Sequence, residues 1–305
     1  HDTSIPGANL IAGIGYISGV KCMIMIDDSG IKAGAASEAT IDKALGCLDI
    51  ALKQKLPCVH LVESAGVDLP NYSVKLWSKF GSVFYKKAKL SAAGIPVIAI
   101  LHGFSTAGGA YQIGMSDYVI GVKGNGMAAL AGSALLKAAT GENASNSDIG
   151  GVEMHSVVTG SVEYLVNDDA ESIITVRKLI DQLNWNENDA QKTILNFEDS
   201  EYPIEDLAGI VPTDYSKGYD VREVIARLVD QSGFIELKPK YGLSMVCAQA
   251  KIEGIQCGII ANNGPIDTKG ATKAAQFIQL CDQANVPLIF LSNVTGYMVG
   301  VKSEH

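Results

Sequence analysis

The chain has 305 residues, of which 47% are hydrophobic, and this length allows two domains with cores of ordinary size. Its formal net charge of −9 argues against binding to nucleic acid, which requires a clustered basic surface. No apolar run approaches the roughly 18 residues of a membrane-spanning helix, and the six cysteines lack CxxC spacing, which predicts buried thiols rather than disulfides or metal ligands.

The first part of the chain alternates short apolar strands with amphipathic helices. Cys22–Ile26 predicts a strand that ends in an acidic turn, and the apolar residues at 41, 45, 48 and 52 share one face of a helix. The runs 96–101 and 287–291 are apolar on both faces, which is typical of strands covered on both sides. Further strands are predicted at 58–62 and 118–122, with helical segments around 80–87 and 110–115.

A polar connection follows this region. A helix is predicted over 169–183, and the polar residues 186–218 include two prolines. Asp220 has the position of an N-cap for a helix with apolar residues at 221, 224, 225 and 228. After this helix the strand pattern begins again at Val246.

Two stretches of the sequence repeat at a nearly fixed distance. Residues 19–26 resemble 254–261, 235 positions later, and residues 57–66 resemble 287–296, 230 positions later. Self-similarity over such a distance indicates a duplicated domain. We therefore predict an α/β fold with two copies of a ββα-repeat domain. The first copy spans 1–185, a connection spans 186–218, and the second copy begins at 219 and continues to 305.

The pair Gly108-Gly109 occurs in only one copy, between a predicted strand and a predicted helix. Its counterpart would fall near residue 338, beyond His305, so the second copy is expected to be incomplete. Helix starts carry unpaired N–H groups, and glycine allows another molecule to approach the backbone. Such donors can stabilise an oxyanion by roughly 3 kcal/mol each. The alternative is that the glycines only permit close packing of strand and helix, and the spacing alone leaves both interpretations open.

The surrounding segments resemble the crotonase superfamily. The resemblance rests on residues 94–103 followed by Ala107-Gly108-Gly109-Ala110, and on the turn at 64–70 after the preceding strand. Because the domain is duplicated, the chain is further similar to the carboxyltransferase subunit of biotin-dependent acyl-CoA carboxylases, in particular the methylcrotonoyl-CoA branch. The blocks that carry this similarity are 135–142, 150–155, 219–227, 262–264 and 295–300.

The resemblance implies a site built from backbone groups. Gly108 and Gly109 are expected to hold the thioester oxyanion, and the acyl-CoA is expected to contact Ala65, Gly66, Val67, Ala107 and Ala129. Gly296 and Tyr297 are expected to face biotin. The family uses carboxybiotin carried on a partner domain, so the implied partners are a biotin carboxylase and biotin carrier subunit and further copies of this chain, in a trimer or hexamer. No metal is implied. The buried thiols favour the cytoplasm or, in a eukaryote, the mitochondrial matrix.

Two positions depart from the family pattern. Ala65 stands where a glycine is usual, and Ala129 stands where the methylcrotonoyl branch tends to have an aromatic residue. Loss of a ring near the acyl group would leave room for a longer chain, such as a geranyl group.

Two other functions stay open at this point. A crotonase-type hydratase or isomerase would need carboxylates on the helix after Gly109, where the sequence has Tyr111-Gln112-Ile113-Gly114. A non-catalytic scaffold subunit would keep the fold alone. His102 and His155 are predicted to be structural, and the acidic pairs 27–28 and 168–169 to cap turns and helices.

Overall fold

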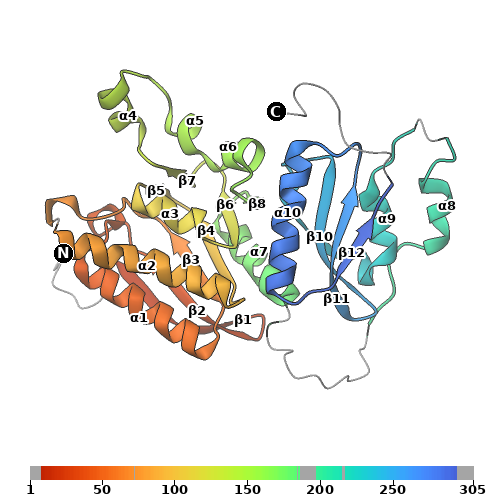
Figure 1. The fold of residues 1–305 in the computed structure, drawn as a ribbon, viewed down its shortest axis with the longest axis horizontal. Coiled ribbons are helices and arrows are strands. Elements are labelled where there is room, and N and C mark those ends of the chain that lie inside the picture. Colours follow the sequence, from red (N-terminus) through yellow and green to blue (C-terminus); the bar gives the residue numbers. More distant parts are fainter. Residues whose placement is uncertain (1–7, 72, 184, 186–196, 215–216, 294–305) are drawn as a thin grey trace. The chain divides into compact units, whose positions relative to one another are not determined.

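The computed structural model describes residues 8–71, 73–183, 185, 197–214 and 217–293. The chain divides into two compact units, the N-unit (1–181) and the C-unit (182–305) (Figure 1). Each is a sheet with helices packed on it, as the predicted α/β class requires.

The N-unit contains a six-stranded sheet in the order β1-β2-β3-β4-β6-β8. β1 and β2 form an antiparallel hairpin, and every later neighbour pairs in parallel. Parallel strands align their carboxyl ends at one edge, so the turns that follow β3 and β4 lie side by side. The strands are β1 (Leu10–Ile17), β2 (Val20–Asp27), β3 (Cys58–Val62), β4 (Val97–Leu101), β6 (Tyr118–Val122) and β8 (Tyr164–Val166).

Helices α1 (Glu38–Gln54) and α2 (Val74–Ala92) pack against each other beside this sheet (Figure 1). α1 begins with a capping box in which Ser37 and Thr40 bond each other's backbone N–H. A short parallel pair, β5 (Phe104–Thr106) and β7 (Met127–Ala129), lies outside the main sheet. The other helices of this unit are α3 (Gly108–Gly114), α4 (Ser133–Thr140), α5 (Asn146–Gly150), α6 (Val152–Met154) and α7 (Asp169–Gln182).

The C-unit contains a four-stranded sheet in the order β12-β11-β10-β9. Two helices cover opposite faces of this sheet (Figure 1). α9 packs on Val246 and Ala250 of β10. α10 packs on Gly258 of β11, which lies on the other face of the sheet. The elements are α8 (Leu207–Ile210), α9 (Val221–Leu228), β9 (Phe234–Leu237), β10 (Met245–Ile252), β11 (Ile255–Asn262), α10 (Thr268–Gln283) and β12 (Leu288–Leu291).

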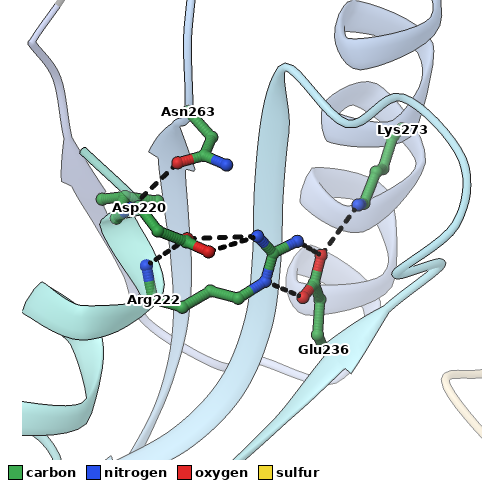
Figure 2. Close-up of polar contacts among 6 residues, drawn as sticks. Asp220, Arg222, Glu236, Asn263 and Lys273 are labelled. Carbon is green, nitrogen blue, oxygen red and sulfur yellow. Dashed lines mark hydrogen bonds and ion pairs between the residues drawn. The ribbon is translucent and has the colours of Figure 1, made fainter. Parts of the chain in front are cut away.

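A charged network ties three of these elements together (Figure 2). Arg222 on α9 forms a bidentate pair with Glu236 on β9, with N···O distances of 2.7 and 2.9 Å. Lys273 on α10 is fully buried, and its Nζ lies 3.2 Å from the same carboxylate. Asp220 caps α9 as predicted, by accepting a hydrogen bond from the Arg222 N–H. The network therefore fixes both helices to the edge strand of the sheet.

The strand registers confirm the duplication. Met23 of β2 pairs with Cys58 of β3, and Gly258 of β11 pairs with Leu288 of β12. These pairs differ by the same 235 and 230 positions that relate the two sequence stretches. The antiparallel hairpins β1–β2 and β10–β11 likewise match in register. The units therefore share one βαβ arrangement after one hairpin.

Two expectations differ from the structure. β4 is buried at every position, as predicted, but β12 is only half-buried and Phe290 is 58% exposed. Among the described residues β12 is the edge strand of its sheet, and no described strand pairs with its outer side. The predicted loop at 103–109 contains the strand β5, and the connection at 186–218 contains α8 and a 3₁₀ turn, Ile204–Asp206.

All six cysteines are unpaired and buried, as the sequence predicts. Cys22 and Cys257 lie on the equivalent strands β2 and β11. Burial raises the pKa of Cys22 to about 12 and that of Cys257 to about 11, so both are thiols at neutral pH.

Candidate functional site

The turn after β3 and the loop after β4 are joined by hydrogen bonds. The Thr106 N–H donates to the Ser64 carbonyl at 2.9 Å, and a Cβ built on Gly66 would lie 3.3 Å from the Gly108 nitrogen. The Ala65 N–H donates to the Ala33 carbonyl at 3.0 Å, which fixes the other side of the turn. The two segments named from the sequence therefore form one site.

The backbone N–H groups of the turn and the loop differ in whether they have an acceptor. Within the turn, Ala65 and Gly66 donate their N–H groups to the Ala33 carbonyl and the Ser64 hydroxyl. Across the described part of the chain, no acceptor bonds the N–H groups of Val67, Gly108 and Gly109. Gly108 is the first residue of α3, where backbone donors have no helical partner.

A pocket of about 460 Å³ lies over Val67 and Gly108. Four of the residues predicted to form the site line it, and its other wall is apolar and largely aromatic. Phe84 stacks edge-to-face with Phe80 and with Tyr111, at centroid distances of 5.0 and 5.5 Å. The lining comprises Ala65, Val67, Ala107 and Gly108, with Trp77, Phe80, Gly81, Phe84, Tyr111 and Leu130.

The aromatic wall comes from α2 and α3, and sequence reasoning missed it as part of a site. Phe80 and Phe84 were expected only to form the packed face of a helix. The signal was present in the 3.6-residue period, which places Trp77, Gly81 and Phe84 on one side of α2. What the period cannot tell is that this side faces the turn at 64–67.

The missing side chains at Gly108 and Gly109 serve packing. A Cβ on Gly108 would lie 2.5 Å from the Phe80 ring, and one on Gly109 would lie 2.3 Å from the Ser64 carbonyl oxygen. Close packing, the alternative considered for these glycines, therefore explains why both lack a side chain. Gly109 does not line the large pocket and faces a smaller cavity of about 40 Å³ behind the loop.

Ala107 holds the loop in a strained conformation. Its φ of 49° and ψ of −120° lie in a region that favours glycine. Such outliers cost about 1–3 kcal/mol and concentrate at functional sites. The Ala107 N–H donates to the Ala129 carbonyl at 3.0 Å, so the β5–β7 pair helps to keep this conformation.

Ala129 lies at the edge of the site but does not line the pocket. Its methyl group faces Gly150, and its carbonyl supports Ala107. The next residue, Leu130, lines the pocket and is 71% exposed. The effect of position 129 on acyl length would therefore act through the backbone of β7. Gly296 and Tyr297, expected to face biotin, lie outside the described residues.

The two histidines differ in their contacts. In His155, Nε2 lies 2.8 Å from the Ala128 carbonyl and Nδ1 lies 2.9 Å from the Thr159 hydroxyl, so both ring nitrogens support the local fold. In His102, Nδ1 lies 4.0 Å from a carboxylate oxygen of Asp169. Neither lines the large pocket.

The polar residues Asp27, His60 and Lys87, of which His60 and Lys87 are buried, were not identified as important from the sequence. Asp27 was expected to cap a turn, yet its carboxylate lies 3.1 Å from His60 Nε2 and accepts the Glu63 N–H at 3.2 Å. Lys87 is fully buried on α2, and its Nζ donates to the Gln112 carbonyl at 3.3 Å. Burial lowers the pKa of Lys87 to about 8. In contrast, Asp28 and Asp168 cap their turns as predicted.

Two features are absent from the described residues. None of their helices is long and apolar enough to cross a membrane. They also contain no group of three or more His, Cys, Asp or Glu side chains placed to hold a metal ion.

With this geometry in hand, the comparisons identify the family. The family model described as "Carboxyl transferase domain" matches residues 1–305. The chain belongs to the carboxyl transferase family. The sequence resemblance to carboxyltransferase subunits is thereby confirmed.

Several carboxyl transferases are similar to this chain over almost all of its length. A mitochondrial methylcrotonoyl-CoA carboxylase beta chain of Dictyostelium discoideum is 42% identical over 302 residues, which is 98% of this chain and 51% of that protein. A probable biotin-dependent acyl-CoA carboxylase beta2 subunit of Mycobacterium tuberculosis is 43% identical, over 98% of this chain and 56% of that protein. The chain spans about half the length of these curated relatives.

Solved carboxyl transferase structures share the fold. The 12S subunit of transcarboxylase, described as a hexamer with hydrolysed methylmalonyl-CoA bound, matches with a TM-score of 0.89 at 31% identity, over 97% of this chain and 59% of that one. The beta subunit of Pseudomonas aeruginosa geranyl-CoA carboxylase is 46% identical with a TM-score of 0.55, over 97% of this chain and 56% of that one.

Proposed function

We propose that this carboxyl transferase chain binds an acyl-CoA and presents its thioester for carboxylation by carboxybiotin. The observation that carries the proposal is that Val67 and Gly108 line one apolar pocket and that their N–H groups have no acceptor among the described residues. Two donors from separate segments can hold a single oxygen, and an oxyanion gains most from donors fixed in advance. The strained loop at Ala107 supports this assignment, because strain is retained where geometry matters.

The donors would act on the thioester carbonyl. When a proton leaves the carbon chain conjugated with the thioester, negative charge moves to the carbonyl oxygen. The Val67 and Gly108 amides would stabilise this charge by roughly 3 kcal/mol each, and the resulting enolate would attack CO2 through carbon. Carboxybiotin bound on a partner domain would supply the CO2, and the biotin anion left behind would take up the proton. Of the predicted site, Gly108 is thus assigned to the oxyanion, and Gly109 to support of the loop.

The acyl group would occupy the aromatic pocket. A volume of about 460 Å³ with an apolar lining suits a branched or extended hydrocarbon better than an acetyl group. We infer a methylcrotonoyl-like or longer acyl group, such as geranyl. The names of the similar proteins, a methylcrotonoyl-CoA carboxylase and a geranyl-CoA carboxylase, agree with this range.

The proposal includes partners. Carboxybiotin implies a biotin carboxylase and biotin carrier subunit, and the second half of the site implies further copies of this chain in a trimer or hexamer. Exposed apolar side chains on β1, including Tyr16 at 71% and Ile11 at 59%, support association. The buried thiols support a reducing compartment, the cytoplasm or the mitochondrial matrix.

The lining of the pocket weighs against the hydratase alternative. Water addition to an enoyl-CoA requires side-chain acids and bases over the thioester. None of the described residues that line the pocket is acidic or a histidine. The scaffold alternative predicts no acyl-CoA binding.

One experiment separates the three functions. The chain is titrated with acetyl-, methylcrotonoyl- and geranyl-CoA by calorimetry, and the complete subunit in complex with the biotin-bearing subunits is assayed for carboxylation and hydration. We expect binding of the longer acyl-CoAs and bicarbonate-dependent carboxylation. Hydration would support the hydratase, and absence of binding would support the scaffold; either outcome contradicts the proposal.

A further inference from the structure

One polar contact occurs in both units at equivalent positions. In the N-unit the Glu63 N–H donates to the Asp27 carboxylate at 3.2 Å. In the C-unit the Asn293 N–H donates to Asn262 Oδ1 at 2.6 Å. Asn262 lies 235 positions after Asp27, and Asn293 lies 230 positions after Glu63, which are the offsets of the duplication.

The contact extends the parallel ladder by one step. Asp27 and Asn262 are the last residues of β2 and β11, and the final paired residues of the adjoining strands are Leu61 and Leu291. Beyond these pairs, the side chain of Asp27 or Asn262, instead of a backbone carbonyl, accepts an N–H of the adjoining segment. It holds the first residue after β3 in one unit, and the second after β12 in the other.

The two side chains use this position differently. Asn262 also donates from Nδ2 to the Asn293 carbonyl at 2.8 Å, so two bonds hold one residue. Asp27 can only accept when ionised, and its other oxygen lies 3.1 Å from His60 Nε2. Both side chains are shielded from water, since Asn262 is 9% exposed and the Asp27 side chain 10%. Such bonds are stronger and more restrictive than exposed ones.

The segment held in the N-unit leads directly to the proposed oxyanion donors. Glu63 precedes Ser64, whose carbonyl accepts from the Thr106 N–H at 2.9 Å and whose hydroxyl accepts from the Gly66 N–H at 3.2 Å. Movement of Glu63 would therefore shift Val67 relative to Gly108. In the C-unit, Asn293 stands three residues before Gly296 in the sequence.

We infer that Asp27 and Asn262 are equivalent positioning residues: Asp27 fixes the backbone that leads to the proposed donor Val67, and Asn262 fixes the backbone of Asn293 after β12. The inference rests on the proposed function for its catalytic consequence, but the positional effect stands without it. A shift of about 1 Å at donors of this kind can cost 10²-fold in rate. Neither residue touches substrate in this assignment.

The test compares Asp27→Ala with Asp117→Ala. Asp117 accepts the Val97 N–H at 2.8 Å at the amino end of β4, so its loss breaks the same kind of bond at the opposite edge of the sheet. In the 305-residue chain, hydrogen exchange of the peptide 63–68 should rise at least 10-fold in Asp27→Ala and stay near the unmodified rate in Asp117→Ala. Equal exchange of 63–68 in both variants would overturn the inference, whether or not the chain is active.

The kinetic arm uses the complete subunit with its biotin-bearing partner. Asp27→Ala should lower kcat at least 10-fold with less than a threefold change in KM for acyl-CoA, and Asp27→Asn should recover most of the loss. A loss in KM alone, or no recovery by Asp27→Asn, contradicts the positioning role. Absence of transfer by the unmodified complex contradicts only the proposed function.

Discussion

The ring of Phe80 lies where a side chain on Gly108 would begin, with Cε1 only 2.5 Å from the position of a Cβ. Gly108 therefore packs against this ring, and its N–H has no acceptor among the described residues. The α-carbon of Gly108 packs against Phe80, and its N–H is the group assigned to the oxyanion. Substitution of either loop glycine would disturb the fold, because Gly109 has the Ser64 carbonyl 2.3 Å from its Cβ position.

We expect Gly109→Val to lower both activity and stability, since the new side chain collides with the Ser64 backbone. A cleaner change is Val67→Pro, which removes one N–H and keeps an apolar side chain. Loss of one oxyanion donor predicts a decrease in kcat of about 10²–10³.

The matched control is Val67→Ala, which keeps the N–H and shortens the side chain. Both variants are checked by circular dichroism and then assayed for carboxylation in the complete subunit. If Val67→Pro retains the rate of Val67→Ala, the assignment of the Val67 amide is wrong.

A pH dependence of stability follows from Lys87. Burial lowers its pKa to about 8 from an ordinary 10.5, so between these values the unfolded chain binds the proton and the folded chain does not. The free energy of unfolding therefore gains from this group as pH rises, by about 3 kcal/mol over the full window. Lys87→Met removes the titration.

Urea unfolding at pH 7, 8.5 and 10 measures this effect. We expect Lys87→Met to be the more stable protein at pH 7 and its advantage to shrink as the pH rises. Taking the difference between the two proteins cancels the cysteines, whose raised pKa values act in the opposite direction above pH 9. A pH-independent difference would contradict a lowered pKa for Lys87 in the folded protein.

The charged network of Figure 2 makes Glu236 critical for the C-unit. Glu236→Gln would leave the fully buried Lys273 and the bidentate partner Arg222 without their carboxylate. Breaking a buried pair from one side costs about 3–5 kcal/mol. Thermal unfolding should show a large decrease in midpoint, whereas Glu38→Gln, at an exposed pair with Lys75, should show little change. Similar shifts in both variants would contradict this role.

Much of the fold could be predicted because its strands are continuous apolar runs and its two copies repeat. β6 has the predicted bounds, and the registers of β2–β3 and β11–β12 follow the repeat distances. The short pair β5–β7 was not predicted, since three residues of mixed polarity carry no periodic signal.

The site was predictable in its segments but not in its atoms. Sequence named Ala65, Val67, Ala107 and Gly108, which line one pocket, together with Gly66, Gly109 and Ala129, which do not line it. It could not tell which backbone N–H groups donate hydrogen bonds to Ala33 and Ser64, because those bonds depend on tertiary contacts. The role of Asp27 was missed for the same reason: an acidic residue after a strand looks like a turn cap until its neighbour Glu63 is known.

The duplication gives the last prediction. The counterpart of Gly108 would fall near residue 338, so a polypeptide of residues 1–305 contains the proposed thioester donors but not the second set. It should bind acyl-CoA through Val67 and Gly108 and fail to carboxylate it when mixed with the biotin-bearing partner. A polypeptide extending past residue 338 should transfer the carboxyl group under the same conditions. Calorimetry and bicarbonate incorporation measure the two steps separately, and equal transfer by both polypeptides would show that one set of donors is sufficient.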